Sequence, residues 1–597
     1  MRPRPIRVAA LAAAALAAAS LAACGGSSKP SSSSSAGKPV SGGTLRFVSS
    51  GDFDHIDPLS GYTTTDVQIS RAWSRQLVTN PASNNFQTAI SVVPDIATVV
   101  PSMSNGGISA DGKTYTFHLR SDAMWNSNPP RAVVAGDFVR EFKRMCNPVL
   151  GVGNPGYYVP VIQGMSAYCD AYAKVPSTAT AAQLANFQNT HNISGVSAPN
   201  ATTLVINLVQ PASDFLNILA SLNFANAAPV EYDSFLPDSP QFRQHTLSDG
   251  PYAITGYTAT KQVVLTKNPA WTQSSDPVRH QYVNKIVINE GQSSATAVQQ
   301  QLQGGSADLS WDVAFPPAQI PAMQSSKDPN FGIFGGHISN PYLVFNMVAG
   351  PAAKSLALRQ AIEYAINKVA IAKDYGGTQL NPPISTVIPP GNVGYQPYNL
   401  YPTPGNNGDP AKCKSILATT PYAKGVTLTM AYRNSGNHPA VFASVQAALA
   451  ACGIKVAGKV FNSVAMYPFL EDPANNKADK WDIAEPGWVP DWYGNNGRTT
   501  VQPLFGTNCT NPTTNYGCYS SKTVDDLIAK ALSATSTTDA GNFWHQADVQ
   551  IMKDAAIVPF MNNNVPLYHS SRVKNVIYMP GAQQFDPTQL WLNPNTP

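Results

Sequence analysis

The sequence predicts a mixed α/β protein that is built from more than one lobe. Stretches such as GGTLRFV at 42–48 and TYTFHLR at 114–120 are strand-like, with apolar residues on alternate positions. Other stretches carry apolar residues at steps of three and four, the spacing of an amphipathic helix. Because the chain has 597 residues and 43% hydrophobic content, it can bury several cores, and we expect two or more lobes.

The first 23 residues have the composition of an export signal. Three arginines within the first seven residues precede an alanine- and leucine-rich run at 8–23, which is too short for a membrane span. The run ends in LAACG at 21–25, which resembles a bacterial lipobox and implies that Cys24 becomes the lipidated first residue. Several acyl chains hold a protein stably on a bilayer. An ordinary secretory signal with a chance cysteine is the alternative.

Residues 24–43 are rich in glycine, serine and proline and predict a flexible tether. The formal charge of +4 falls to +1 once the three arginines of the signal are removed. A nearly neutral chain gives no electrostatic reason to expect a nucleic-acid partner. No second long apolar run follows the signal. We therefore expect a folded body on the extracytoplasmic side, tied to the membrane by its lipid.

Six cysteines follow Cys24, an even number in a compartment that permits disulfides. Fifteen pairings are compatible with six cysteines, and free buried thiols are a further alternative. None of the six lies in a C-x-x-C motif or beside a histidine cluster, so we expect no metal site. We favour pairing between sequence neighbours: Cys146 with Cys169, Cys413 with Cys452, and Cys509 with Cys518.

The segment EPGWVPDWYGNN at 485–496 is the strongest candidate for a binding loop. Its prolines and glycines favour a loop, and Asp491 stands among Trp488, Trp492 and Tyr493. One carboxylate among aromatic faces suits a cationic, partly apolar ligand. The alternative is a loop whose indoles cover the core while Asp491 caps a turn.

An ordered set of motifs resembles the family 5 solute-binding proteins of ABC importers, which are receptors for peptides, dipeptides and nickel. The resemblance covers most of the mature chain. The matching segments are VPDIAT (93–98), DGKTYTFHLR (111–120), GDFVREFKR (136–144), NPAW (268–271), NKIVINEGQSSATAVQQQLQGGSADLSWD (284–312), SNPYLVFNM (339–347), SLALRQAIEYAINKVAIAKDYGG (355–377), PLFG (503–506) and AAIVPFMNNN (555–564).

The resemblance implies a two-lobed, periplasmic-binding-protein-like α/β fold of class II (cluster C), with a hinge and an extra subdomain in lobe one. We expect the signal at 1–23, the lipidated cysteine and linker at 24–43, and lobe one at 44–290 with its inserted subdomain at about 80–215. Lobe two is expected at 291–557, and the chain returns to lobe one at 558–597. The hinge crossings are placed near 284–291 and 558–563.

The resemblance also implies a function and a site. Peptide-binding members carry a G-W-x-x-D-Y sequence whose aspartate holds the ligand's α-ammonium, and Gly487 to Trp492 matches it with tryptophan in the last position. Asp491 is then the anchor. Pro490, which lacks an N–H, and the following YGNNGR depart from the family pattern. Further candidate ligand-binding residues are Tyr493, Asn346, Trp125 and Tyr62.

The implied partners are a peptide or other small solute, a membrane permease and its ATPases, with the receptor acting as a monomer without a cofactor. A sugar, an opine or a metal chelate is the alternative ligand. An exported hydrolase and a sensory lipoprotein are remote alternatives. No G-x-S-x-G, H-E-x-x-H, P-loop or G-x-G-x-x-G motif is present, so we expect no enzyme.

Overall fold

The computed structural model of the chain describes residues 37–221, 223–462 and 465–594, so the predicted signal peptide and Cys24 lie outside the described residues. Residues from Val40 onward form one compact unit. Within the described residues, no helix is long and apolar enough to cross a membrane.

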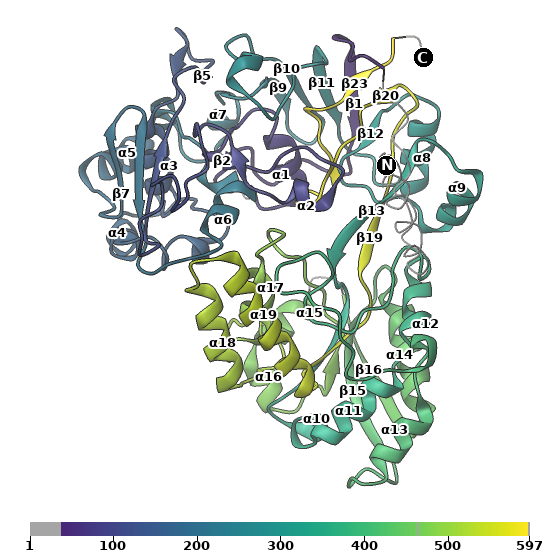
Figure 1. Cartoon of the computed structure of the whole chain (residues 1–597). Coiled ribbons are helices and arrows are strands. Elements are labelled where there is room, and N and C mark those ends of the chain that lie inside the picture. Colours follow the sequence, from purple (N-terminus) through teal and green to yellow (C-terminus); the bar gives the residue numbers. More distant parts are fainter. Residues whose placement is uncertain (1–36, 222, 463–464, 595–597) are drawn as a thin grey trace, which may run out of the picture. The chain divides into compact units, whose positions relative to one another are not determined.

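The first lobe is organised on a five-stranded sheet with the strand order β12-β1-β11-β10-β9 (Figure 1). Strand β1 pairs in parallel with β11 and β12, whereas β10 is antiparallel to β11 and β9. The alternation predicted for 42–48 is confirmed, since Leu45 and Phe47 are fully buried. The strands are β1 (Thr44–Val48), β9 (Tyr252–Thr258), β10 (Gln262–Lys267), β11 (Lys285–Asn289) and β12 (Leu309–Ser310).

A smaller three-stranded sheet, β4-β8-β7, forms a subdomain of the first lobe. In β4, Tyr115 and Phe117 are buried as predicted, and their rings join a core that includes α3 and α5. The helix expected from Asp137 to Met145 is α3, whose Asp137 caps its own N-terminus. The elements are β4 (Thr114–His118), β7 (Val196–Asn200), β8 (Thr203–Asn207), α3 (Ala135–Arg144), α4 (Met165–Tyr172) and α5 (Ala181–Thr190).

The second lobe is organised on a sheet with the strand order β16-β15-β17-β14-β18. The segment 355–377 has apolar residues at steps of three and four, which predicts one helix with an apolar stripe, and this stripe is buried at Leu358 and Ile362. It spans two helices rather than one, because α11 ends before Ile366 and Asn367 caps α12. The elements are β14 (Tyr342–Phe345), β15 (Val426–Arg433), β16 (Ile454–Phe461), β17 (Ile483–Ala484), β18 (Ile557–Pro559), α11 (Leu356–Ala365), α12 (Lys368–Asp374), α13 (Pro410–Leu417) and α14 (His438–Ala450).

Further helices and short strands complete the described chain. The helices are α1 (Thr64–Ser70), α2 (Phe86–Ala89), α6 (Phe215–Ser221), α7 (Pro240–Arg243), α8 (Ala295–Gln303), α9 (Ile320–Ser326), α10 (Gly350–Lys354), α15 (Met466–Glu471), α16 (Pro473–Lys477), α17 (Gly497–Phe505), α18 (Lys522–Leu532) and α19 (Thr537–Lys553). The strands are β2 (Val78–Thr79), β3 (Val93–Pro94), β5 (Met124–Trp125), β6 (Arg131–Ala132), β20 (Val573–Lys574), β21 (Tyr578–Met579), β22 (Gln584–Phe585) and β23 (Trp591–Leu592).

Two antiparallel strands, β13 (Phe331–Ile338) and β19 (Asn563–Tyr568), connect the two sheets (Figure 1). Strand β13 leads from the first sheet to β14, and β19 leads from β18 back to His569, which bridges to Leu309. Our placement of a crossing at 284–291 is therefore corrected. That stretch is β11, which is paired on both sides inside the first sheet.

The six cysteines lie in the three neighbour pairs favoured by the sequence. The Cα–Cα distances are 5.2 Å for Cys146 and Cys169, 6.0 Å for Cys413 and Cys452, and 5.1 Å for Cys509 and Cys518. These distances are within the range that a disulfide requires.

Candidate functional site

The segment 485–496 is a loop, as predicted, and it connects β17 to α17 in the second lobe. Gly487 packs closely against Asn340, because a Cβ there would be 2.1 Å from Oδ1 of Asn340 and would require that side chain to move. Its N–H donates to the hydroxyl of Tyr467 at 3.2 Å. The start of the loop is therefore held against the body of the second lobe.

The carboxylate of Asp491 accepts hydrogen bonds from two phenols of the first lobe. Tyr62 donates its hydroxyl to Oδ1 at 2.9 Å, and Tyr157 donates to Oδ2. Asn154 in turn donates its amide to the Tyr62 hydroxyl at 3.3 Å. Segments that lie hundreds of residues away in the sequence thus meet the loop at Asp491.

The pKa of Asp491 is set by its burial and by two neutral hydrogen-bond donors. Burial raises the pKa of Asp491, while the hydrogen bonds from Tyr157 and Tyr62 oppose that shift. Burial, together with the adjacent carboxylate, raises the pKa values of both phenols, so they remain protonated donors. Within the described part of the chain, no lysine, arginine or histidine pairs with Asp491. The carboxylate therefore lacks a counter-ion.

The aromatic residues of the loop have different surroundings. Trp492 is fully buried in the core of the subdomain, where its ring meets the Tyr157 ring edge-on at 4.9 Å. Its indole N–H donates to the carbonyl of Asn495 at 2.7 Å. Trp488 is partly buried in the second lobe and donates to the carbonyl of Thr499. Trp492 is therefore inaccessible to a ligand in this structure, although the sequence placed it among the binding residues of the loop.

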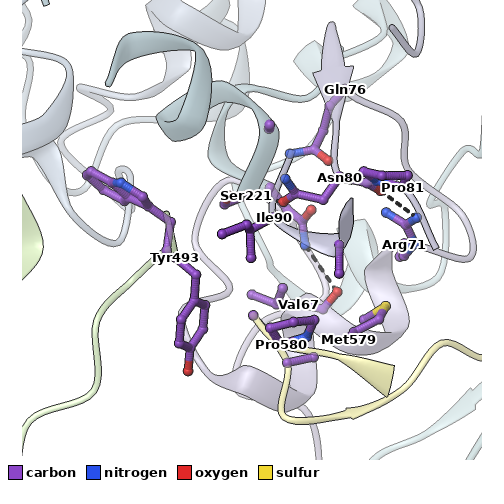
Figure 2. A pocket seen from close by; sticks show the side chains of 16 residues that line it. Val67, Arg71, Gln76, Asn80, Pro81, Ile90, Ser221, Tyr493, Met579 and Pro580 are labelled. Atoms are coloured by element: carbon purple, nitrogen blue, oxygen red, sulfur yellow. Dashed lines mark hydrogen bonds between the residues drawn. The ribbon is translucent and has the colours of Figure 1, made fainter. Parts of the chain in front are cut away.

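Tyr493 forms one wall of a narrow pocket in the first lobe (Figure 2). Arg71 also lines the pocket. Its guanidinium already donates hydrogen bonds to the carboxylate of Asp586 at 2.8 Å and to the carbonyl of Asn80 at 2.9 Å. Its volume is about 60 Å³, below the range of about 300–1,000 Å³ that is typical of ligand pockets. Tyr493 therefore contributes to packing around the site.

Asn346 and Trp125 do not face a cleft, which corrects two of the predicted ligand-binding residues. Asn346 is fully buried, and its amide donates to the carbonyls of Asn476 and Trp481, both at 3.0 Å. Trp125 is 2% exposed and donates its indole N–H to Asp137 at 2.9 Å. Both side chains are structural because their polar atoms are already used inside a lobe.

A larger cavity of about 390 Å³ lies between the two lobes, beside the crossing strands. It is lined by residues of α1, α8 and β19 and by the start of α14, so both lobes contribute to its walls. It adjoins the Asp491 loop, because Gln583 in its wall donates to the hydroxyl of Tyr493 at 3.5 Å. Its volume is in the range of ligand pockets.

Sequence reasoning missed Tyr157, Asn154 and the amide-rich walls of the cavity. The signal for Tyr157 is its position in GNPGYY at 153–158, an aromatic pair in a glycine- and proline-rich loop like that of Asp491. Nothing in the sequence pairs it with a residue more than three hundred positions away.

Two α/β lobes, two crossing strands and a cavity between the lobes define a binding protein of the two-lobed solute receptor class. The chain belongs to the bacterial extracellular solute-binding proteins, family 5, whose model matches residues 91–509. As a member of this family, the chain is an extracellular solute-binding protein rather than an enzyme.

Relatives and solved structures agree with this family. The glutathione-binding protein GsiB of Shigella dysenteriae is 24% identical over 398 residues, which are 65% of this chain and 72% of that protein. The clavulanic acid biosynthesis oligopeptide binding protein 2 has a TM-score of 0.79 at 20% identity, with 93% and 96% of the two chains covered. OppA of Haemophilus influenzae, in complex with RPPGFSPFR, has a TM-score of 0.65 at 18% identity, with 93% and 100% covered. These structural likenesses show the fold.

Proposed function

We propose that this protein captures peptides with a free α-ammonium group in the cavity between its lobes and delivers them to a membrane permease driven by ATPases. The observation that carries the proposal is the carboxylate of Asp491, which is held by two neutral phenols of the opposite lobe and lacks a counter-ion. An ammonium group supplies the missing positive charge.

The geometry leaves room for such a partner. A carboxylate has about four acceptor positions, and the two phenols use one on each oxygen. An ammonium that donates to the remaining positions forms charge-assisted hydrogen bonds, which are stronger than neutral ones. The two tyrosines fix the direction of the carboxylate before the ligand arrives, so less order has to be imposed on binding.

The names of the relatives support a peptide ligand. GsiB is a glutathione-binding protein, and the similar structures include DppA of Helicobacter pylori with the peptide STSA and OppA of Haemophilus influenzae with RPPGFSPFR. Neither a sugar nor a metal chelate is named among these relatives, so the peptide remains the proposed ligand.

We propose that the lobes move about β13 and β19, the two strands that connect the sheets. The other domain limits stay proposals: lobe one begins at 44 and has its subdomain at about 80–215. The end of lobe two is moved from 557 to the end of β18 at Pro559, because β18 pairs with β14, and the chain returns to lobe one after it. The start of lobe two is moved from 291 to the end of β13, because β12 still pairs with β1.

The test uses residues 25–597 with a pool of free-amine peptides and its N-acetylated copy, measured by thermal shift and titration calorimetry. We expect a shift of several degrees with the free peptides, and we expect acetylation and Asp491→Ala each to abolish it. An uncompensated buried ammonium costs about 3–5 kcal/mol. Asp526→Ala, an exposed acid on α18, is the matched control and should bind normally. Binding that survives both changes would rule out the Asp491 anchor.

We further propose that Cys24 carries the lipid anchor and that the three cysteine pairs are disulfides in the exported protein. Replacing the lipidated residue in Cys24→Ser should release the receptor from the membrane fraction into the medium or periplasm, which cell fractionation measures. Retention of Cys24→Ser in the membrane fraction would contradict the anchor.

A further inference from the structure

We propose that the cavity between the lobes selects peptides whose enclosed part is uncharged, and that it disfavours a free carboxylate inside it. This inference rests on the proposed function, because it names the class of peptide that the same cavity accepts. It concerns the part of the peptide beyond its amino group, including a carboxyl end, whereas Asp491 is proposed to bind the amino group itself.

The cavity begins close to the anchor. Thr65 in its wall lies three residues after Tyr62, which donates to Asp491. On the other side, Gln583 in the wall meets the hydroxyl of Tyr493, two residues after Asp491. The segments that carry Tyr62 and Asp491 therefore border the cavity.

The wall contains almost no charge. Among its lining residues in the described part of the chain, none is lysine, arginine or histidine, and Asp312 is the one acid. Asp312 is exposed at the edge and accepts from the N–H of Ser50 at 2.8 Å and from its hydroxyl. Together with Asp491, it makes this region favourable for cations and unfavourable for anions.

The wall offers amides in place of charges. Gln299 is 2% exposed, and its Nε2 has no hydrogen-bond partner within the described residues. Asn437, directly before α14, and Asn564, on β19, also line the cavity, and neither amide is bonded to another described residue. Such groups match the N–H and C=O groups of a peptide and its neutral polar side chains. A buried polar group without a partner is unfavourable, so a hydrogen-bonding ligand gains most from meeting Gln299.

Two basic residues close to Asn437 lie beside an acid. His438 follows Asn437, and its Nδ1 lies 2.7 Å from Oε2 of Glu485. Arg433 stacks over Tyr467 at 5.4 Å, and its Nη2 lies 3.4 Å from the same His438 nitrogen. The carboxylate of Glu485 therefore offsets positive charge at this place and opposes a second carboxylate. A carboxylate that enters the cavity loses hydration without gaining an ion pair.

The test compares one short peptide with neutral side chains as its free acid and as its C-terminal amide, both with a free amino group, by titration calorimetry. We expect the amide to bind about tenfold more tightly, because only the acid brings an unpaired anion into the cavity. Equal affinities, or tighter binding of the acid, would overturn the inference.

Two variants place a cation in the cavity wall: Asn564→Arg on β19 and Asn437→Arg at the start of α14. Each should remove or reverse the preference for the amide, whereas Asn542→Arg on the exposed side of α19 is the control and should leave it unchanged. A preference that neither wall variant changes would overturn the inference. If N-acetylation left the affinity unchanged while the amide still bound more tightly than the acid, the result would contradict the Asp491 anchor but not the preference of the cavity.

Discussion

Two regions of this protein hold buried carboxylates in opposite ways. In the first lobe, Asp95 lies 2.8 Å from Arg75 and 2.9 Å from Arg279, and Asp276 lies within 3.5 Å of both guanidiniums. At the loop, Asp491 has only the hydroxyls of two tyrosines. Burial raises the cost of ionisation at both sites, yet only the first contains its own counter-ions.

The charges of the first region balance. Burial opposes ionisation of Asp95, but Arg279 and Arg75 overcome it and hold the pKa of Asp95 below its usual value. Burial raises the pKa of the neighbouring Asp249 to about 8, so two guanidiniums face two carboxylates and one neutral acid at pH 7. A balanced cluster stabilises the fold, whereas an unbalanced acid between lobes is suited to an external cation.

The largest expected effect comes from unbalancing the cluster. Arg279→Met leaves buried carboxylates without a partner, and we expect a loss of about 3–5 kcal/mol in the free energy of unfolding, measured with urea. Lys522→Met breaks an exposed pair with Asp526 on α18 and should have no measurable effect. If the two variants behaved alike, the cluster would not be a stabilising one.

Asp491→Asn should act in the other direction on stability. It removes an unpaired charge and keeps the shape, so the free energy of unfolding should stay equal or rise, while peptide affinity falls by about 100-fold. Titration calorimetry and urea unfolding of the same sample measure both. A loss of stability as large as that of Arg279→Met would mean that Asp491 has a counter-ion within the protein, and it would contradict the proposed difference between the two sites.

The pH dependence of stability separates Asp249 from its neighbours. Because its folded pKa of about 8 lies above the unfolded value of 3.8, its contribution is present below the unfolded pKa and is lost as the pH rises to about 8. The slope is at most about 1.4 kcal/mol per pH unit. Asp249→Asn should therefore gain stability relative to the natural protein as the pH rises, in urea unfolding across that range. A constant difference would contradict a neutral Asp249.

The smallest effects are expected from the phenols. Tyr157→Phe and Tyr62→Phe each remove one donor from Asp491, which raises its pKa further and weakens peptide binding by about 1 kcal/mol. Tyr62 is 42% exposed, so water can replace its hydroxyl and its effect should be the smaller. Because the ammonium needs an ionised carboxylate, binding by both variants should fail at a higher pH on acidification than it does in the natural protein. Calorimetry over a pH series measures this shift.

Local patterns predicted most of the elements and the anchoring loop. The alternating apolar residues of β4 are compatible only with a half-buried strand, and the apolar spacing of α11 only with an amphipathic helix. Asp491 could be identified because all residues of its motif are adjacent in the sequence. The hinge was misplaced because the apolar run of β11 looks the same in sequence whether it lies inside a sheet or between two.

Long-range contacts could not be predicted from the sequence. Asn346 resembles a ligand-binding amide, but its partners are backbone carbonyls more than a hundred residues away. The cluster of Arg75 and Arg279 likewise joins charges that are separated by about two hundred positions. Sequence identifies which side chains can do chemistry, and the fold decides which of them are already occupied.

The burial of Trp492 also has a kinetic consequence. Its indole comes from the second lobe but packs in the core of the first. Exposing a side chain of roughly 200 Å² to water costs about 5 kcal/mol, which would slow the departure of a bound peptide by a few thousandfold. Any separation of the lobes that withdraws this ring from the first lobe therefore has to overcome this barrier, so the buried indole opposes opening.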